Sequence, residues 1–75
     1  MRKPHVDDLV RLVHDVPDLE LHRGQIGVVR STWFAPSMAY EVEFDADGGR
    51  QQVRCLLDDA AVEIDFDDAI AANPA

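Results

Sequence analysis

Two stretches decide the fold of this 75-residue chain: GQIGVVR at residues 24–30 and YEVEF at residues 40–44. The first is rich in β-branched residues, and the second alternates apolar and acidic side chains with period two, so both are typical of β-strands. Since successive strand residues point to opposite faces, the second stretch is expected to turn its apolar residues inward and Glu41 and Glu43 toward solvent or a partner. The expected inward residues are Tyr40, Val42 and Phe44.

The other strands are short apolar runs between turn residues. The first run is shorter than about ten residues and is closed by Pro17, which favours a strand over the helix that Asp7 or Asp8 could cap. Five strands at spacings near ten residues indicate an all-β fold, a small antiparallel barrel or roll. The expected strands span residues 8–14, 26–31, 40–45, 51–57 and 61–65.

Turn signals separate these runs. Gly24 and Gly27 suggest a tight turn followed by a bulge or a strongly bent strand, and the segment 45–49 suggests a hairpin connection. Leu19 or Leu21 is expected to pin the preceding loop to the core. The chain thus forms one domain over residues 1–75, with a core at about 7–65. Residues 66–75 are expected to form a short tail or helical turn that frays unless Phe66 or Ile70 docks.

Composition narrows the function. The net charge is −8, all of it from residues 33–75, because the preceding residues balance five bases against five acids. A surface of this sign repels phosphates and argues against nonspecific binding of nucleic acid or anionic lipid. The chain has no apolar run long enough for a membrane span and a single cysteine, Cys55, in phase with apolar neighbours, so a cytoplasmic location and a buried thiol are expected.

Catalytic and metal-binding patterns are weak. His5, His14 and His22 have no nucleophilic serine or cysteine nearby in the sequence, so no catalytic residue is expected. The stretch 45–48 resembles the start of a calcium loop, but the further acidic ligands are missing, and a hairpin turn explains the same residues. We expect no metal and no cofactor.

The pattern DLVRL at residues 8–12, GVV at 27–29 and AYEVEF at 39–44, with Gly49-Arg50 and Leu56-Leu57, resembles a bacterial family of very short proteins that carry a domain of unknown function. The resemblance covers about residues 7–65 and implies an SH3-like barrel. The chain is also similar, at the level of the fold, to the SH3-like barrel of the nitrile hydratase β subunit and to the KOW element. The resemblance implies no catalytic residues.

The loop 31–38 is the main candidate for a binding site, because aromatic and methionine side chains concentrate apolar contact area. Its aromatic residues either cap an open end of the barrel or lie exposed beside an acidic rim. The leading hypothesis is a non-enzymatic module that binds a basic protein, as an antitoxin or immunity protein would. An accessory subunit of a larger enzyme is the alternative, KOW-type nucleic-acid binding is less favoured, and homo-oligomers stay open. The candidate partner-binding residues are Trp33, Phe34, Met38, Glu41 and Glu43.

Overall fold

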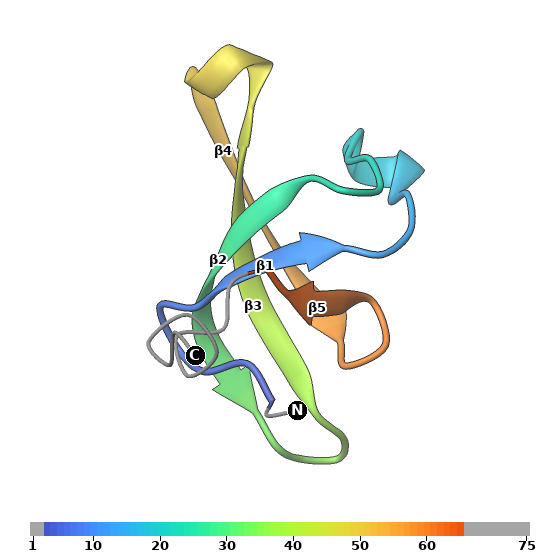
Figure 1. Ribbon diagram of the computed structural model, residues 1–75, viewed down its shortest axis with the longest axis vertical. Helices are drawn as coiled ribbons and strands as arrows, with labels where there is room; N and C mark the ends of the chain where they lie inside the picture. Colours follow the sequence, from blue (N-terminus) through green and yellow to red (C-terminus); the bar gives the residue numbers. More distant parts are fainter. Residues whose placement is uncertain (1–2, 66–75) are drawn as a thin grey trace, which may run out of the picture.

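The computed structural model describes residues 3–65, which form one antiparallel sheet with the strand order β4-β3-β2-β1-β5 (Figure 1). Two short 3₁₀ helices, η1 and η2, interrupt the strands, and the described residues contain no α-helix. The prediction of five antiparallel strands is confirmed. The elements are β1 (Leu9–Leu12), η1 (Pro17–Leu19), β2 (Ile26–Trp33), β3 (Ala39–Ala46), η2 (Asp47–Gly49), β4 (Gln51–Asp58) and β5 (Val62–Ile64).

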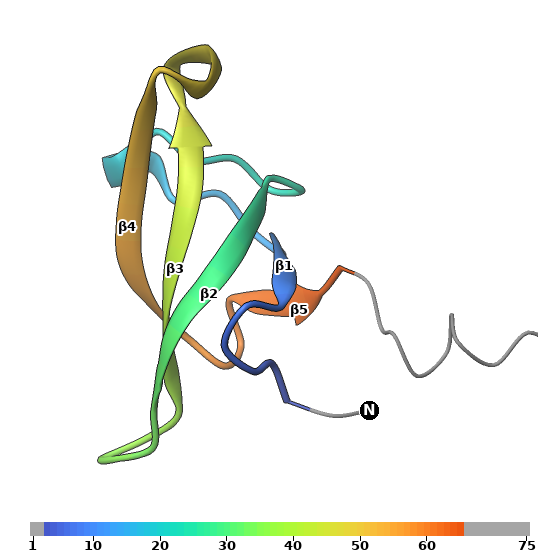
Figure 2. The same ribbon diagram turned by 90° about the vertical axis from the view of Figure 1, so that its left-hand side faces the viewer.

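The sheet is strongly twisted but open. Figure 2 shows β2, β3 and β4 side by side, with β1 and β5 crossing them at a steep angle. β4 and β5 are the two edge strands, and within residues 3–65 they do not pair with each other, so the sheet curls around its core without closing into the expected barrel. The tail predicted at residues 66–75 lies outside the described residues.

The core lies inside the curl of the sheet. Tyr40, Val42 and Phe44 on β3 are fully buried, which confirms the faces predicted from the alternating pattern. They pack with residues of every other strand, so a single cluster joins the two crossing halves of the sheet. The other buried members are Val10, Leu12, Leu21, Val29, Leu57, Ala61 and Val62.

Two glycines before and within β2 have different roles. Gly24 has a φ of +90°, which glycine adopts without steric cost, so the predicted tight turn is confirmed. Gly27 sits on the core face, where a Cβ would lie 2.6 Å from Val42 Cγ1 and 2.7 Å from Phe44 Cε1. No larger residue fits there without displacing the core, so Gly27 sets how closely β2 approaches the side chains of β3.

The connections after β1 and between β3 and β4 have the features that their sequences predict. The excursion after β1 is pinned by Leu21, which is buried and forms a bridge with Val16, whereas Leu19 is exposed. Gly48 and Gly49 take positive φ values of 63° and 88° between β3 and β4, as a hairpin connection there requires.

The second strand is longer than predicted. It was expected to end at Ser31, but pairing with β3 continues through Thr32 and Trp33, so the loop that remains is Phe34–Met38. Trp33 is therefore a strand residue and not a loop residue. Conversely, β1 is shorter than expected, because pairing with β2 and β5 is confined to Leu9–Leu12.

Candidate protein-binding surface

A β-bulge in β2 controls which side chains reach the surface. Val29 is paired with Val42 and Ser31 with Glu41, so Arg30 is an extra residue in β2. Alternation predicts that Trp33 shares the core face of Val29, but the extra residue shifts Trp33 to the opposite, outer face of the sheet. We call this face of β2, β3 and β4 the outer face; its members include Arg30, Ser31, Trp33, Ala39, Glu41, Glu43, Arg54, Leu56 and Asp58.

The aromatic residues that follow the bulge are exposed. Trp33 retains 55% and Phe34 73% of its accessible surface, so neither caps an open end of the sheet. Met38 differs, because it is half-buried and packs against the core cluster. The predicted aromatic site is thus Trp33 and Phe34 at the surface, with Met38 anchoring the loop to the core.

A shallow groove runs beside this loop. It has a volume of about 440 Å³ and lies between the N-terminal segment and the loop, with Phe34 and Met38 on one wall. Backbone hydrogen bonds between Asp7 and Val29 and between Val29 and Asp8 hold the N-terminal segment to β2. The remaining lining residues are Lys3, Pro4, His5, Val6 and Thr32.

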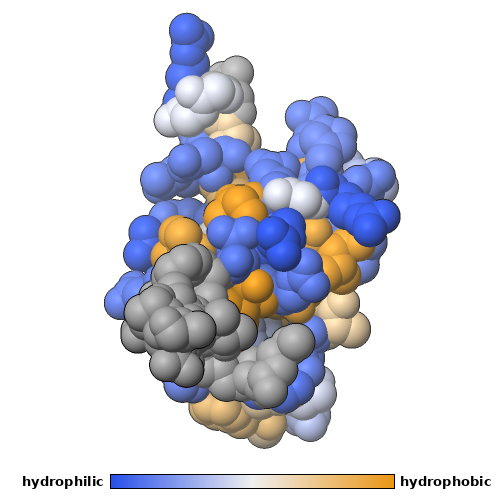
Figure 3. All heavy atoms as spheres, viewed as in Figure 1, coloured by the Kyte–Doolittle hydropathy of each residue, from blue (hydrophilic) through white to orange (hydrophobic). Residues whose placement is uncertain are grey.

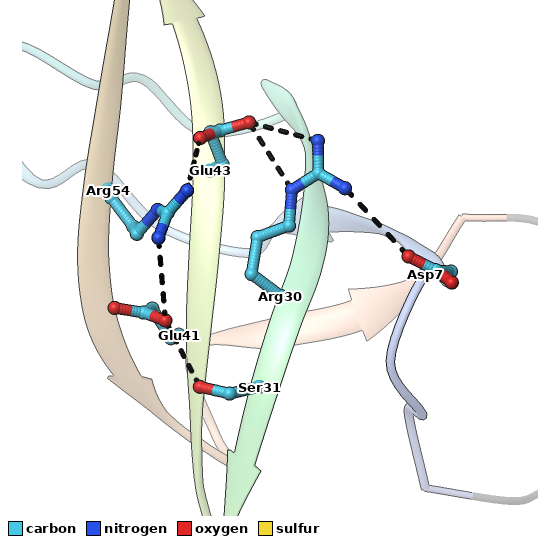
Figure 4. Close-up of polar contacts among 6 residues, drawn as sticks. All are labelled: Asp7, Arg30, Ser31, Glu41, Glu43 and Arg54. Carbon is cyan, nitrogen blue, oxygen red and sulfur yellow. Dashed lines mark hydrogen bonds and ion pairs between the residues drawn. The ribbon is translucent and has the colours of Figure 1, made fainter.

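The two predicted acidic residues lie in an ion-pair ladder on the outer face (Figure 4). Glu43 accepts hydrogen bonds from Arg30 Nη2 at 3.0 Å and from Arg54 Nη2 at 2.9 Å, and its side chain is only 12% exposed. Glu41 accepts from Ser31 Oγ at 3.1 Å and lies 3.9 Å from Arg54 Nη1. The ladder joins three strands, and a further contact of 3.8 Å links Arg30 to Asp7.

This ladder corrects the prediction of a free acidic face. Hydrogen bonds from Arg54 and Arg30 hold the pKa of Glu43 below its usual value, so the carboxylate is ionised and already paired. Glu43 therefore joins the strands and does not form an open acidic rim. Glu41 is more accessible, with 38% of its side chain exposed, and can meet a partner while it keeps its bond to Ser31.

A second polar cluster, which was not predicted from the sequence, lies at the end of β4. The buried Tyr40 donates a hydrogen bond of 2.9 Å from its hydroxyl to Asp59 Oδ1, and Lys3 forms an ion pair with Asp59. Burial, followed by this hydrogen bond, raises the pKa of Tyr40 to about 12. Ion pairing with Lys3 and the bond from Tyr40 lower the pKa of Asp59. The cluster satisfies the one polar atom that Tyr40 carries into the core.

The three histidines and Cys55 form no metal-binding group within residues 3–65. His5, His14 and His22 are exposed and lie apart, on the N-terminal segment, after β1 and near the hairpin. His22 borders a polar hollow of about 830 Å³ between η1 and the β3–β4 connection, and no group of three potential metal ligands occurs in the described part of the chain. Cys55 is half-buried, and burial raises the pKa of its thiol, which agrees with an apolar role.

The fold and the site of residues 3–65 define a class: a small open antiparallel sheet with an exposed aromatic pair and a salt-bridged outer face. The chain belongs to the family described as a domain of unknown function (DUF4926), whose pattern matches residues 7–64. The matched segment begins before β1 and ends at the last residue of β5, so it coincides with the sheet. The predicted resemblance to a family of unknown function is confirmed.

No curated protein and no solved structure matches the chain. Within residues 3–65, no helix is long and apolar enough to cross a membrane. The resemblance to the nitrile hydratase β subunit and to the KOW element therefore stays a prediction from the sequence.

Proposed function

We propose that this chain is a non-enzymatic, cytoplasmic module that binds a protein partner through Trp33 and Phe34. The observation that carries the proposal is the exposure of both side chains, 55% and 73%, at the end of a strand whose other half places Gly27 and Val29 in the core. Exposed aromatic side chains are costly to leave in water and are enriched among residues that dominate binding energy at interfaces. The groove beside Phe34 and Met38 gives a partner's side chain a place to insert.

Charge favours a basic partner. The chain carries a net charge of −8. Two of its acids lie on the outer face near the aromatic residues: Glu41 is paired with Ser31, and Asp58 is paired with Ala39, the partner of Trp33. An apolar anchor beside exposed carboxylates fits a partner with an apolar pocket and a basic rim, and charge complementarity accelerates such encounters. An inhibitor of the antitoxin or immunity type, which covers a basic protein, is the form of this function that we favour.

The test is capture of the partner from the native host by immobilised protein. We expect the wild type to enrich a basic protein, and the double variant Trp33→Ser/Phe34→Ser to lose it. Leu19→Ser is the matched control, because Leu19 is also an exposed apolar residue but lies on η1, away from the loop. Circular dichroism of all three proteins checks that the fold is unchanged.

Capture that survives the loss of both aromatic residues would contradict the proposed site. A second pair of variants separates the two acids: Glu41→Gln should weaken capture, whereas Glu43→Gln should act mainly on the stability of the sheet. If the two variants lose capture equally and are equally stable, Glu43 would be part of the binding surface.

An accessory subunit that packs permanently on a larger enzyme is the second candidate. It is favoured by two more apolar residues exposed on neighbouring strands, Leu9 on β1 at 42% and Ile26 on β2 at 38%. On the face drawn in Figure 3, hydrophobic residues form separate patches divided by hydrophilic residues. If this role is correct, Leu9→Ser and Ile26→Ser should raise the yield of the soluble isolated chain, and they should leave it unchanged if the chain functions alone.

A further inference from the structure

The two edges of the sheet differ in how open they are to another strand. β5 has three residues, contains Glu63 and is followed by Asp65, and both of these acids pair with Arg11 on β1. β4 has eight residues, all paired with β3 without a register shift, and it contains no proline or lysine. Proteins usually blunt edge strands by making them short, bulged or charged. β4 is neither short nor bulged, and Arg54 is the one charged residue in its interior.

β4 also presents apolar side chains on both of its faces. Val53 and Cys55 on the core face are half-buried, and within residues 3–65 no strand pairs with the free edge of β4 beside them. On the outer face Leu56 is 63% exposed. A strand added to this edge would cover side chains on both faces at once, which is the arrangement used in β-strand addition.

We propose that the occupant of this edge is a second copy of the chain, paired antiparallel through β4 about a two-fold axis at Leu56. In this register Leu56 lies opposite Leu56 of the second copy, and Cys55 lies opposite Leu57 of the second copy. Arg54 lies opposite Asp58 of the second copy, and the two-fold axis generates this pair twice. Every pair from Arg54 to Asp58 is then apolar with apolar or cation with anion, which favours cross-strand association.

The charged groups retain capacity for these contacts. Arg54 is 52% exposed, and Glu43 accepts from its Nη2 and Glu41 lies near its Nη1, which leaves further donors of the guanidinium for another carboxylate. Asp58 is exposed, and its Oδ1 accepts from the backbone N–H of Ala60. A carboxylate has two oxygens that accept several hydrogen bonds, so Asp58 can keep this bond and meet a guanidinium.

Neighbouring registers match less well. A shift that centres the axis on Arg54 places two guanidinium groups opposite each other, which is destabilising. A shift that centres it on Cys55 sets Arg54 against Leu56 of the second copy and leaves both charges of the pair without an opposite charge. Registers with no residue on the axis place core-face residues opposite outer-face residues, so neither face continues across the edge.

This inference goes beyond the proposed function and does not depend on it: Trp33 and Phe34 lie outside the paired segment, and Asp58 is the one residue that the two proposed surfaces share. The test is the mass in solution as a function of concentration, measured by sedimentation equilibrium. We expect the wild type to rise from 8.4 kDa toward twice that mass. Arg54→Asp and Asp58→Arg should each stay monomeric at tenfold higher concentration, because each sets like charges opposite each other at both ends of the pairing.

An equimolar mixture of these two variants is the decisive sample. In the mixed pair each variant places opposite charges at both positions, so the mixture should form a heterodimer although neither component dimerises. This result cannot arise from misfolding of either variant. A wild type that stays monomeric at all concentrations, or a mixture that stays monomeric, would overturn the proposal.

Cross-linking checks the register. In a Cys55→Ser background, Leu56→Cys should form an intermolecular disulfide upon mild oxidation, because the two-fold axis places the two thiols opposite each other. Gln52→Cys in the same background is the matched control, since Gln52 lies on the same face of β4 but outside the paired segment. Cross-linking of the Gln52 variant in place of the Leu56 variant would contradict this register.

Discussion

The two halves of β2 have different roles although they belong to one strand. The first half spans residues 26–29 and the second spans residues 31–33. In the first half Gly27 and Val29 are buried against β3, whereas in the second half Trp33 is exposed on the outer face. The difference comes from Arg30, the extra residue that moves all later side chains by one position. One bulge therefore allows a strand to build the core at one end and to present an aromatic residue at the other.

Single-residue deletions in β2 should have the largest effects on stability, and these effects should depend on which residue is removed. Deletion of Val28 moves Ile26 into the place of Gly27, where a Cβ lies within 3 Å of Val42 and Phe44, so we expect loss of the cooperative unfolding transition. A domain of this size has about 3–5 kcal/mol of net stability to lose. Deletion of Arg30 leaves every other side chain on its own face and should retain a cooperative transition. Urea titrations measure both, and equal damage by the two deletions would argue against the bulge assignment.

Gly27→Ala tests the close packing of the first half alone. The added methyl group would lie 2.6 Å from Val42 Cγ1, so either the strand or the core must shift. Overpacking of this kind typically costs about 1–3 kcal/mol of the free energy of unfolding. Ser31→Ala, in the second half, is the control and should have a smaller effect in the same urea titration.

Tyr40→Phe tests the core-facing side of the second half, because Tyr40 is paired with Thr32. Removing the hydroxyl deletes its hydrogen bond to Asp59, and we expect a loss of about 0.5–1.5 kcal/mol. Tyr40 is the only tyrosine, so phenolate absorbance should titrate with a pKa of about 12.

Tyr40 also predicts the direction in which stability changes at high pH. Because the folded pKa of Tyr40 lies above the unfolded value of about 10, its contribution is complete below pH 10 and is lost as the pH rises toward 12. The wild type should therefore lose its advantage over Tyr40→Phe in that window. A phenolate that titrates near 10 in the folded protein would contradict the buried position.

Glu43→Gln tests the ladder that ties the two halves to β3 and β4. The pKa of Glu43 is lowered in the folded protein, so its contribution is present at neutral pH and is lost as the pH falls below the usual glutamate value through the folded pKa. The wild type should be more stable than Glu43→Gln near neutral pH, and the difference should vanish in acid. Thermal melts across this range measure the difference, and a difference that grows in acid would reverse the assignment.

Trp33→Ser should have the smallest effect on stability, within about 0.5 kcal/mol, since the indole is already exposed. Trp33 is the only tryptophan, so intrinsic fluorescence reports on it directly. The emission of the folded protein should be close to that of free tryptophan in water and readily quenched by acrylamide. A blue-shifted, protected emission would place the indole in the core and would also remove the basis of the proposed binding site.

Much of the fold could be predicted because the sequence pattern is local. The period of two in YEVEF assigned both faces of β3, and glycines marked the turn at Gly24 and the hairpin at Gly48 and Gly49. The face of the sheet on which Trp33 lies could not be predicted, because no residue near Arg30 marks the position of the bulge. Sheet closure could not be predicted either, since it depends on how the twist brings distant strands together.

The candidate site was predicted in part, for similar physical reasons. Two aromatic residues in succession after a polar strand end indicated a binding loop, and both are exposed. The pairing of Glu43 with Arg54 was missed, although counting back along the two strands from the hairpin gives their register directly. The bond from Tyr40 to Asp59 needed the three-dimensional structure, because the turn after β4 brings the carboxylate to the hydroxyl.

The two ends of the sheet domain meet at β1. The backbone N–H of Asp65 donates to Leu9 O at 3.0 Å, and Asp7 N–H donates to Val29 O on the neighbouring strand at 2.8 Å. The chain thus enters and leaves the domain at nearly the same place, so a host protein could carry residues 7–65 inserted in a surface loop without pulling that loop apart. For the same reason a circular permutant, joined there by a short linker and opened between Gly48 and Gly49, preserves all four strand pairings.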